Sequence, residues 1–268
     1  MKLQVLVDNN TYIDQYYLGE PGVSYYVEID DRKILFDAGY SDIMIQNAYS
    51  LGVDLKGLTH IVLSHGHNDH TKGLKYLFSQ FCLPNVRLVA HPGCFVPRWE
   101  QERYIGSPFS EEEIDRLCLY QPSRAPFYIS KNCCYLGEIP SFNQFEERPL
   151  TGTAIVDGKE VSDSVPDDSA IACRTEKGIF IITGCSHSGI CNIVEYAKQV
   201  LGCDRIAGII GGFHLFDADK RLEKTIEFLK SSSVGNMYPC HCVSLKAKAE
   251  MMKHMQINEV GVGLSLQF

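Results

Sequence analysis

The sequence predicts a layered α/β or α+β sandwich, in which helices cover β-sheets. Short apolar runs that are typical of strands come first in a block and then alternate with helical patterns, and this order occurs in each half of the chain. The 268 residues are 45% hydrophobic and 22% charged, a composition that suits one large core or two small cores fused closely.

The first half of the chain begins with strands. Apolar, β-branched and aromatic runs predict strands at residues 3–7, 23–29, 33–39 and 60–65. A helix is expected to begin near Ser41 and to end at Gly52. A second helix should start at Asp69 or His70, and a strand at residues 86–91 follows it.

Regular alternation returns in the second half. Strands are expected at residues 169–175, 178–184, 204–212 and 236–240, with helices after Ser188, over residues 218–231 and after Ser244. Residues 92–150 show poor periodicity, apart from a helical stretch that opens with a capping box at Ser110 and Glu113. We therefore expect an insertion at about 92–150 that covers one edge of the core.

Composition excludes several classes of function. The formal net charge is -8 and no basic run is present, which disfavours general nucleic-acid binding. No apolar stretch reaches the ~18 residues that a bilayer crossing requires, and no signal peptide is visible. The eleven cysteines are an odd number without paired CxxC spacing, which favours reduced thiols. These observations lead us to expect a cytoplasmic protein with no membrane partner.

The stretch SHGHNDH, residues 64–70, concentrates imidazole and carboxylate groups. In a strand His65 and His67 would point to the same face, so both could hold one cation, and Asp69 and His70 would leave toward a second point nearby. Nitrogen ligands with a single carboxylate suit zinc, iron, manganese or cobalt better than calcium or magnesium. A histidine-rich solvated loop is the alternative interpretation, and the spacing disfavours it.

Three later histidines also follow apolar runs at the points where loops begin. They are His187, His214 and His241. Loops at strand ends are where scaffolds place reactive groups, so the repeated position favours metal or substrate binding over an ordinary core role. His60, inside a strand, and His254, on a late helix, are expected to be structural.

Other residues fit a pocket around such a site. Asp37 follows an apolar strand and would orient a ligand histidine or a water, or else cap the helix that begins near Ser41. His91 and Glu138 are candidates for substrate binding, with a structural role equally open. Aromatic side chains in the expected insertion could stack on a flat ring, although aromatic residues more often belong to a core.

The spacing HxHxDH at residues 65–70, the later histidines and the early Asp37 resemble the metallo-β-lactamase superfamily, over nearly the whole chain. The resemblance implies one domain over residues 1–268, an αββα sandwich with two mixed sheets packed face to face. It also implies two divalent metal ions, with zinc in first place and iron or manganese as alternatives. The implied ligands are His65, His67 and His187 for the first metal and Asp69, His70 and His241 for the second.

An aspartate usually bridges the two metals in this superfamily, from the strand between the last two histidines. Here the strand end carries His214 instead, and Asp217 lies three residues further on. A neutral histidine in place of a carboxylate leaves the site more positive, which favours an anionic ligand such as a diphosphate. The candidate catalytic residues are Asp37, Asp69 and His214, and His214 is also a candidate for substrate binding.

Four further stretches resemble one branch of the superfamily, the dihydropterin and ribofuranosyl-aminobenzene phosphate synthases: TGCSHSGICNI, GGFHL, LGEIP and HC. In that branch a pterin methyl diphosphate is joined to an aromatic ribose phosphate. The chain differs from the branch at three points, where it has Lys72, Ser141 and the pair Val243–Ser244.

The expected activity is therefore that of a dinuclear metal-dependent enzyme on a phosphorylated, pterin-like or diphosphate-bearing small molecule. Two cations lower the pKa of a bound water and neutralise a departing phosphate oxygen, so hydrolysis and transfer with a diphosphate leaving group both remain open. An iron-dependent oxidoreductase and a metal-binding sensor without turnover are the alternatives. The oligomeric state is left open.

Overall fold

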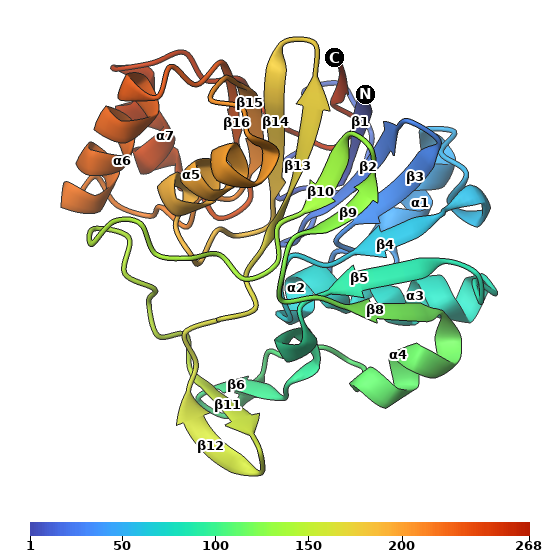
Figure 1. The fold of residues 1–268 in the computed structure, drawn as a ribbon. Helices are drawn as coiled ribbons and strands as arrows, with labels where there is room; N and C mark the ends of the chain where they lie inside the picture. Colours follow the sequence, from blue (N-terminus) through green and yellow to red (C-terminus); the bar gives the residue numbers. More distant parts are fainter.

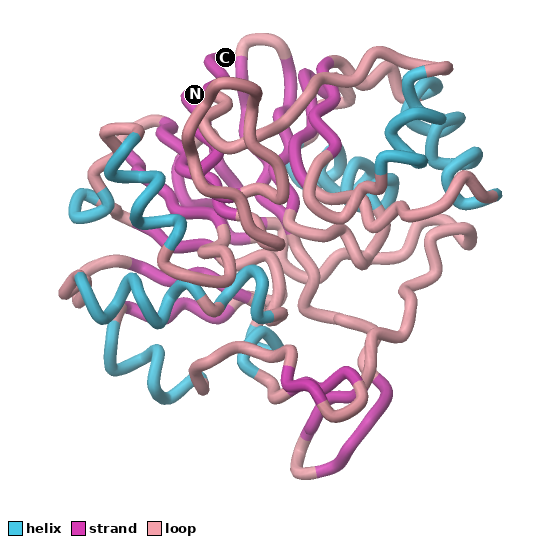
Figure 2. Tube along the Cα trace, turned by 180° about the vertical axis from the view of Figure 1, so that it is seen from behind, coloured by secondary structure: helices cyan, strands magenta, loops and turns pink.

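Two large β-sheets pack face to face, and helices cover both outer faces of the pair (Figure 1). This arrangement comes from a computed structural model that describes residues 1–268. A third, small sheet projects from one end, as Figures 1 and 2 both show. The first and last strands pair, so the two termini lie side by side. The predicted layered sandwich is confirmed.

The strands form three sheets. In spatial order the first sheet contains β17 (Ser265–Gln267), β1 (Lys2–Val7), β2 (Ser24–Ile29), β3 (Arg32–Phe36), β4 (His60–Val62), β5 (Arg87–Ala90) and β8 (Leu119–Pro122). The second contains β16 (Asn236–Pro239), β15 (Ile206–Gly211), β14 (Gly178–Thr183), β13 (Ala170–Thr175), β10 (Cys133–Tyr135) and β9 (Phe127–Ser130). The third contains β12 (Lys159–Ser162), β11 (Thr153–Val156), β6 (Arg98–Glu100) and β7 (Arg103–Tyr104).

Seven α-helices and two short 3₁₀ turns connect these strands. They are α1 (Ile43–Ser50), η1 (Leu55–Gly57), α2 (Asn68–Thr71), α3 (Gly73–Gln80), η2 (Pro92–Phe95), α4 (Glu111–Leu117), α5 (Ile190–Leu201), α6 (Lys220–Ser231) and α7 (Leu245–Met252). Ser110 and Glu113 form the predicted capping box at the start of α4. None of the helices has both the length and the apolar character needed to cross a membrane.

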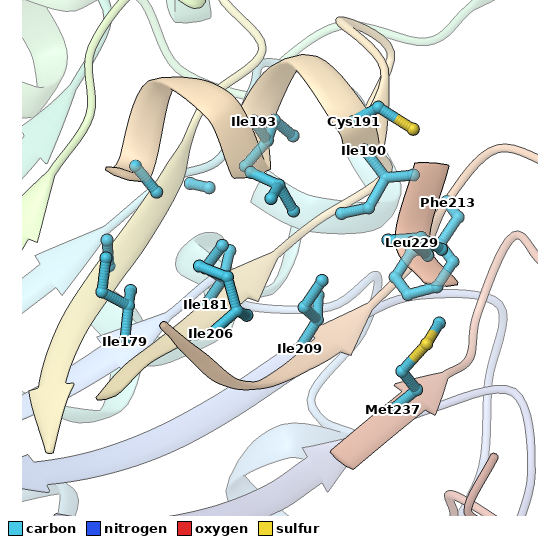
Figure 3. Packing of buried hydrophobic residues seen from close by; sticks show 14 of the residues in the cluster. Ile179, Ile181, Ile190, Cys191, Ile193, Ile206, Ile209, Phe213, Leu229 and Met237 are labelled. Carbon is cyan, nitrogen blue, oxygen red and sulfur yellow. The ribbon is translucent and has the colours of Figure 1, made fainter. Parts of the chain in front are cut away.

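Alternation along the strands divides the apolar side chains among three cores. On β3, Ile34 and Phe36 belong to the core between the two large sheets, whereas Leu35 packs toward α1 and α3. On β14, Phe180 and Ile182 face the same central core, and their neighbours face α5, as Figure 3 shows. Both sheets therefore bury both faces, which produces the four layers.

Residues 92–150 do not form one separate unit. Strand β8 extends the first sheet, β9 and β10 extend the second, and only β6 and β7 join β11 and β12 in the small third sheet. Each of these strands is two to four residues long, so its own sequence carries little periodicity and its partners decide its place.

His60 lies at the start of β4, at the opposite end of that strand from the SHGHNDH stretch. Burial, together with the charges of Arg32 and Arg87, lowers its pKa from 6.5 to about 4. The unfolded chain therefore takes up a proton as the pH falls through 6.5, whereas the folded protein does so only near 4. Protonation in that range favours unfolding.

Acidification from about pH 7 to about pH 4.5 is expected to lower the free energy of unfolding by about 2 kcal/mol through His60. Urea unfolding of the metal-free protein at both pH values measures this loss. A His60→Gln variant should show a loss smaller by that amount. The same pH dependence in both proteins would show that His60 does not contribute.

Candidate metal centre

The loops that carry the candidate site residues lie at one edge of the two large sheets. Strands β3, β4 and β5 run parallel in the first sheet, and β14, β15 and β16 run parallel in the second. Parallel strands end at the same edge, and ligands commonly bind outside these carboxyl ends. Asp37, His65, His187, His214 and His241 all follow such ends.

The SHGHNDH loop lies at the centre of this edge. Strand β4 ends at Val62, so His65 and His67 belong to a loop and not to the expected strand, yet their rings converge. Gly66 permits this because a Cβ at that position would lie 2.0 Å from the backbone oxygen of Cys94. Helix α2 then starts at Asn68 and carries Asp69 and His70 away from the pair.

Three histidines form the first group. His65 Nε2 lies 3.0 Å from His67 Nδ1. The ring of His187 lies 4.9 Å from that of His65 and 5.0 Å from that of His67, measured between centroids. All three side chains are buried.

The second group contains one carboxylate. Asp69 Oδ2 lies 3.4 Å from His70 Nε2 and 3.3 Å from His241 Nε2. Cys185 completes this group and also belongs with His65 and His187, because its Sγ lies within 4.8 Å of the ligand atoms of both sets. The structure thus brings together all six side chains that the resemblance assigns to two metals.

These donor atoms fit metal binding. Two donors at about 2.1 Å from a tetrahedral zinc ion lie about 3.4 Å apart, close to the separations of 3.0–3.4 Å within the two groups. His67 Nε2 and both ring nitrogens of His187 are buried without a hydrogen-bond partner. Buried polar atoms without partners are costly, so a ligand for His187 is expected on physical grounds.

The histidine pKa values shift in different directions in the two groups. Burial, followed by the charges of neighbouring imidazoles, lowers the pKa of His65 and of His187 well below the usual range, and burial lowers that of His67 to about 4. These rings stay neutral, the form that binds metal. Burial also opposes the charged form of His70, but Asp69 and Asp37 raise its pKa well above the usual range. The same negative surroundings favour a metal ion in place of that proton.

Asp37 orients two of the histidines. Its carboxylate accepts a hydrogen bond from His70 Nδ1 at 2.7 Å and one from Ser64 Oγ at 2.7 Å. Ser64 Oγ in turn accepts from His65 Nδ1 at 2.9 Å. Both rings therefore keep Nε2 free to face the centre. Asp37 does not cap α1, whose N-cap residue is Asp42.

An Asp37→Asn variant is expected to weaken metal binding by about 10–100-fold, the usual cost of losing a partner that orients a metal ligand. Asparagine keeps the size of the side chain and tolerates the left-handed backbone at φ 56, so the loss reports the carboxylate. Metal titration of the purified variant measures it. The control is Asp42→Asn, and equal affinities in the two variants would contradict the role of Asp37.

His241 has partners that were not identified from the sequence. Its Nδ1 donates to Asn9 Oδ1 at 3.0 Å, and its backbone N–H donates to Asp8 Oδ1 at 3.1 Å. Asp8 and Asn9 directly follow β1, which ends at the same sheet edge. Their position after an apolar strand was a signal that could have found them.

A buried ion pair also holds the SHGHNDH loop in place. Arg98 is 1% exposed, donates to Asp163 at 2.7 Å and also pairs with Asp167. Asp167 accepts the backbone N–H of Gly66 at 2.8 Å. Arg98 on β6 thus links the small third sheet to the metal loop, a role that nothing in its local sequence indicates.

Several residues at this sheet edge adopt left-handed backbone conformations, which residues other than glycine rarely adopt. The φ angles are 56° at Asp37, 59° at Ser186, 50° at His214 and 52° at His241. Such conformations cost about 1–3 kcal/mol each and cluster at functional sites. Their concentration here supports a functional role for this edge.

Other candidate residues lie outside both groups. The ring of His214 lies 4.4 Å from that of His187, and burial lowers its pKa to about 4, but it joins neither ligand set. Asp217, the weaker candidate for a bridge, is exposed and pairs with Lys246 at 3.0 Å.

His91 lines a different cavity, and Glu138 lies beside His91. Gly93 donates to His91 Nδ1 at 2.9 Å, and His91 Nε2 lies 3.0 Å from Arg124 and 3.5 Å from Glu138. The cavity that His91 lines includes none of the six metal-binding candidates. Of the aromatic residues expected to stack on a substrate, Trp99 and Tyr104 pack edge-on against each other.

A cavity of about 350 Å³ opens directly onto the two groups. Its lining includes His67 and Asp69 together with Tyr40 and Arg103. Lys72 lies over the Tyr40 ring, with Nζ 3.8 Å from the centroid. The cavity therefore combines an aromatic ring, the positive charge of Arg103 and the carboxylate of Glu100, with a second positive charge, Lys72, beside the ring.

The chain belongs to the metallo-β-lactamase superfamily, whose sequence model matches residues 18–195. It is 31% identical to the 7,8-dihydropterin-6-methyl-4-(β-D-ribofuranosyl)-aminobenzene-5′-phosphate synthase of Methanocaldococcus jannaschii, over 96% of this chain and 92% of that protein. It is 36% identical to an uncharacterized protein of the same organism, over 97% of this chain and 96% of that protein. The predicted family and branch resemblance are confirmed.

Solved structures agree with this assignment. A metal-dependent hydrolase of the β-lactamase superfamily superposes with a TM-score of 0.86 at 28% identity, covering 100% of this chain and 99% of that one. A diphosphatase of the PhnP family shares the fold, with a TM-score of 0.58 at 16% identity over 100% of this chain and 97% of the other. The αββα sandwich that the resemblance implied is thereby confirmed.

Proposed function

We propose that this protein is a dinuclear metal-dependent enzyme that acts on a phosphorylated small molecule. The observation that carries the proposal is the convergence of six metal-binding side chains from three separate segments of the chain at one sheet edge. The unpaired buried nitrogens of His187 support it, because they lack a partner in the protein. As part of the proposal we place the enzyme in the cytoplasm.

His65, His67 and His187 would hold the first metal, and Asp69, His70 and His241 the second. Zinc suits this donor set best, with iron or manganese as alternatives. When bound, two such cations supply Lewis-acid stabilisation of phosphate oxygens and lower the pKa of water. Asp37 would fix the rings of His65 and His70, a role that its hydrogen bonds support.

The substrate would enter through the cavity beside His67 and Asp69. Arg103 in the lining and Lys72 over the Tyr40 ring offer positive charge to a phosphate or diphosphate group, next to the carboxylate of Glu100, and the Tyr40 ring offers a flat surface. A pterin-like substrate fits this combination, and the relative named as a dihydropterin-type synthase supports it. His214, adjacent to His187, is proposed as a further substrate contact.

Hydrolysis and transfer with a diphosphate leaving group both suit the proposed site. The similar structure described as a hydrolase supports the first, and the relative described as a synthase supports the second. His91 and Glu138 are left out of the proposed site because His91 lines a separate cavity and Glu138 lies 3.5 Å from His91.

Anaerobic metal analysis followed by assays with phosphodiesters, diphosphates and pterins tests the proposal. We expect two metals per chain and turnover of a phosphorylated substrate that is lost in a His67→Ala variant. Iron with turnover of oxygen or thiols would favour an oxidoreductase instead. Bound metal without turnover of any substrate class would favour a sensor.

An Arg103→Ala variant is expected to raise KM for the phosphorylated substrate about tenfold with little change in kcat, because hydrogen bonds to charged groups contribute about 1.5–3 kcal/mol. Steady-state kinetics measure the change. Lys75→Ala, which removes an exposed charge from the neighbouring helix α3, serves as the control. A KM that is unchanged in the Arg103 variant would place the phosphate elsewhere.

A further inference from the structure

Cys185 lies between the two groups of metal-binding side chains. Its Sγ lies within 4.8 Å of the ligand atoms of Asp69, His70 and His241, and equally within 4.8 Å of those of His65 and His187. It lies 3.2 Å from His70 Nε2. No other side chain belongs to both groups.

The backbone fixes Cys185 in this position. Strand β14 ends at Thr183, and Ser186 adopts the left-handed conformation while its hydroxyl donates to Gly212 O at 2.6 Å. This turn lets Cys185 and His187, two residues apart, both reach the centre. Cys185 is only 5% exposed, so its thiol is part of the interior of the site.

Without Cys185 the proposed centre has a single negatively charged ligand. Asp69 is the only acidic side chain among the six proposed ligands, and the position expected for a bridging aspartate carries His214. Asp217 points to Lys246 instead. Two divalent cations in a buried site need more than one negative ligand, because uncompensated buried charge is costly. A thiolate is a strong ligand for zinc, iron and cobalt.

We propose that the Cys185 thiolate bridges the two metals in place of the missing aspartate. The inference rests on the dinuclear centre of the proposed function. Two metal–sulfur bonds form, and the thiol proton leaves to the solvent. With bonds of about 2.3 Å and a metal separation of about 3.5–4 Å, the angle at sulfur is about 100–120°, which an unstrained bridge can adopt.

Cys242 provides a matched control. Its Sγ accepts the backbone N–H of His214 at 3.3 Å and lies 3.5 Å from the carbonyl oxygen of Cys185, to which its thiol donates. It is therefore a neighbouring thiol at the same edge, but it belongs to neither ligand group. A thiolate ligand other than Cys185 would most readily come from this residue.

Cobalt(II) loaded under anaerobic conditions tests the bridge. We expect the unaltered protein and Cys242→Ser to bind two cobalt ions, to show sulfur-to-cobalt charge-transfer absorption, and to give one sulfur per cobalt at about 2.3 Å by X-ray absorption. Cys185→Ser should lose the sulfur signals and bind the second cobalt at least about tenfold more weakly. Cys185→Asp should bind two cobalt ions without the sulfur signals, because a carboxylate restores the bridge.

Several results would overturn the bridge while leaving the dinuclear proposal intact. They are two bound cobalt ions without any sulfur neighbour, about half a sulfur per cobalt, or sulfur signals that disappear in Cys242→Ser and survive in Cys185→Ser. The first two need only the unaltered protein, so a variant that fails to fold does not affect them. Failure of the unaltered protein to bind cobalt would overturn both proposals.

Discussion

A His187→Ala variant is expected to bind the first metal at least about 100-fold more weakly than the unaltered protein and to lose turnover with it. Changes to residues that merely orient a ligand already cost about 10–100-fold, and His187 is proposed to be a ligand itself. The same variant should be no less stable than the unaltered protein when both are free of metal. Both ring nitrogens of His187 are buried without partners, so its imidazole is unfavourable there until a metal binds.

Thermal unfolding with and without a chelator separates these effects. Metal should raise the Tm of the unaltered protein more than that of His187→Ala, which keeps only the second group of ligands intact. His254→Ala is the control, because that ring is exposed and lies 3.4 Å from Glu250, away from both ligand groups. Equal metal-dependent stabilisation of His187→Ala and the unaltered protein would contradict the ligand role.

An Arg98→Ala variant is expected to lose about 3–5 kcal/mol of unfolding free energy, the usual cost of breaking a buried ion pair from one side. Asp163 and Asp167 would remain buried without their cation. Burial already raises the pKa of Asp167 to about 6, so proton uptake can relieve part of the cost near neutral pH. The loss should therefore be larger at higher pH.

Urea unfolding of the metal-free protein at two pH values measures this loss. Arg103→Ala is a suitable control, because Arg103 lies on β7 of the same small sheet and is exposed. Comparable losses in the two variants would show that Arg98 does not support the metal loop.

The layers of the fold were predictable because their strands alternate. On β14, neighbouring residues such as Phe180 and Ile181 belong to different cores, and the sequence of that strand shows its length and its buried character directly. The same rule placed Asp37, His65 and His187 at or just beyond the ends of strands, although β3 and β4 end three residues earlier than predicted. Parallel strands then bring those loops to one edge without further information.

The small strands were not predictable in the same way. Strands β6 to β10 contain two to four residues each and depend on partners distant in sequence for their place. A single expected insertion at about 92–150 was therefore divided among three sheets. Arg98 shows the consequence for the site, because its partners Asp163 and Asp167 lie 65 and 69 residues further on.

Position after a strand also proved insufficient to define a ligand. His91 follows β5 as His65 follows β4, yet His91 is held by Gly93 and Arg124 at another cavity. Cys185 shows the opposite case. A lone buried cysteine is usually a small apolar residue, and only its distances to both groups distinguish it from one.

Anomalous scattering from crystals grown with zinc tests the dinuclear centre most directly. We expect two peaks about 3.5–4 Å apart, one among His65, His67 and His187 and the other among Asp69, His70 and His241. A single peak, or zinc bound away from these side chains, would contradict the account.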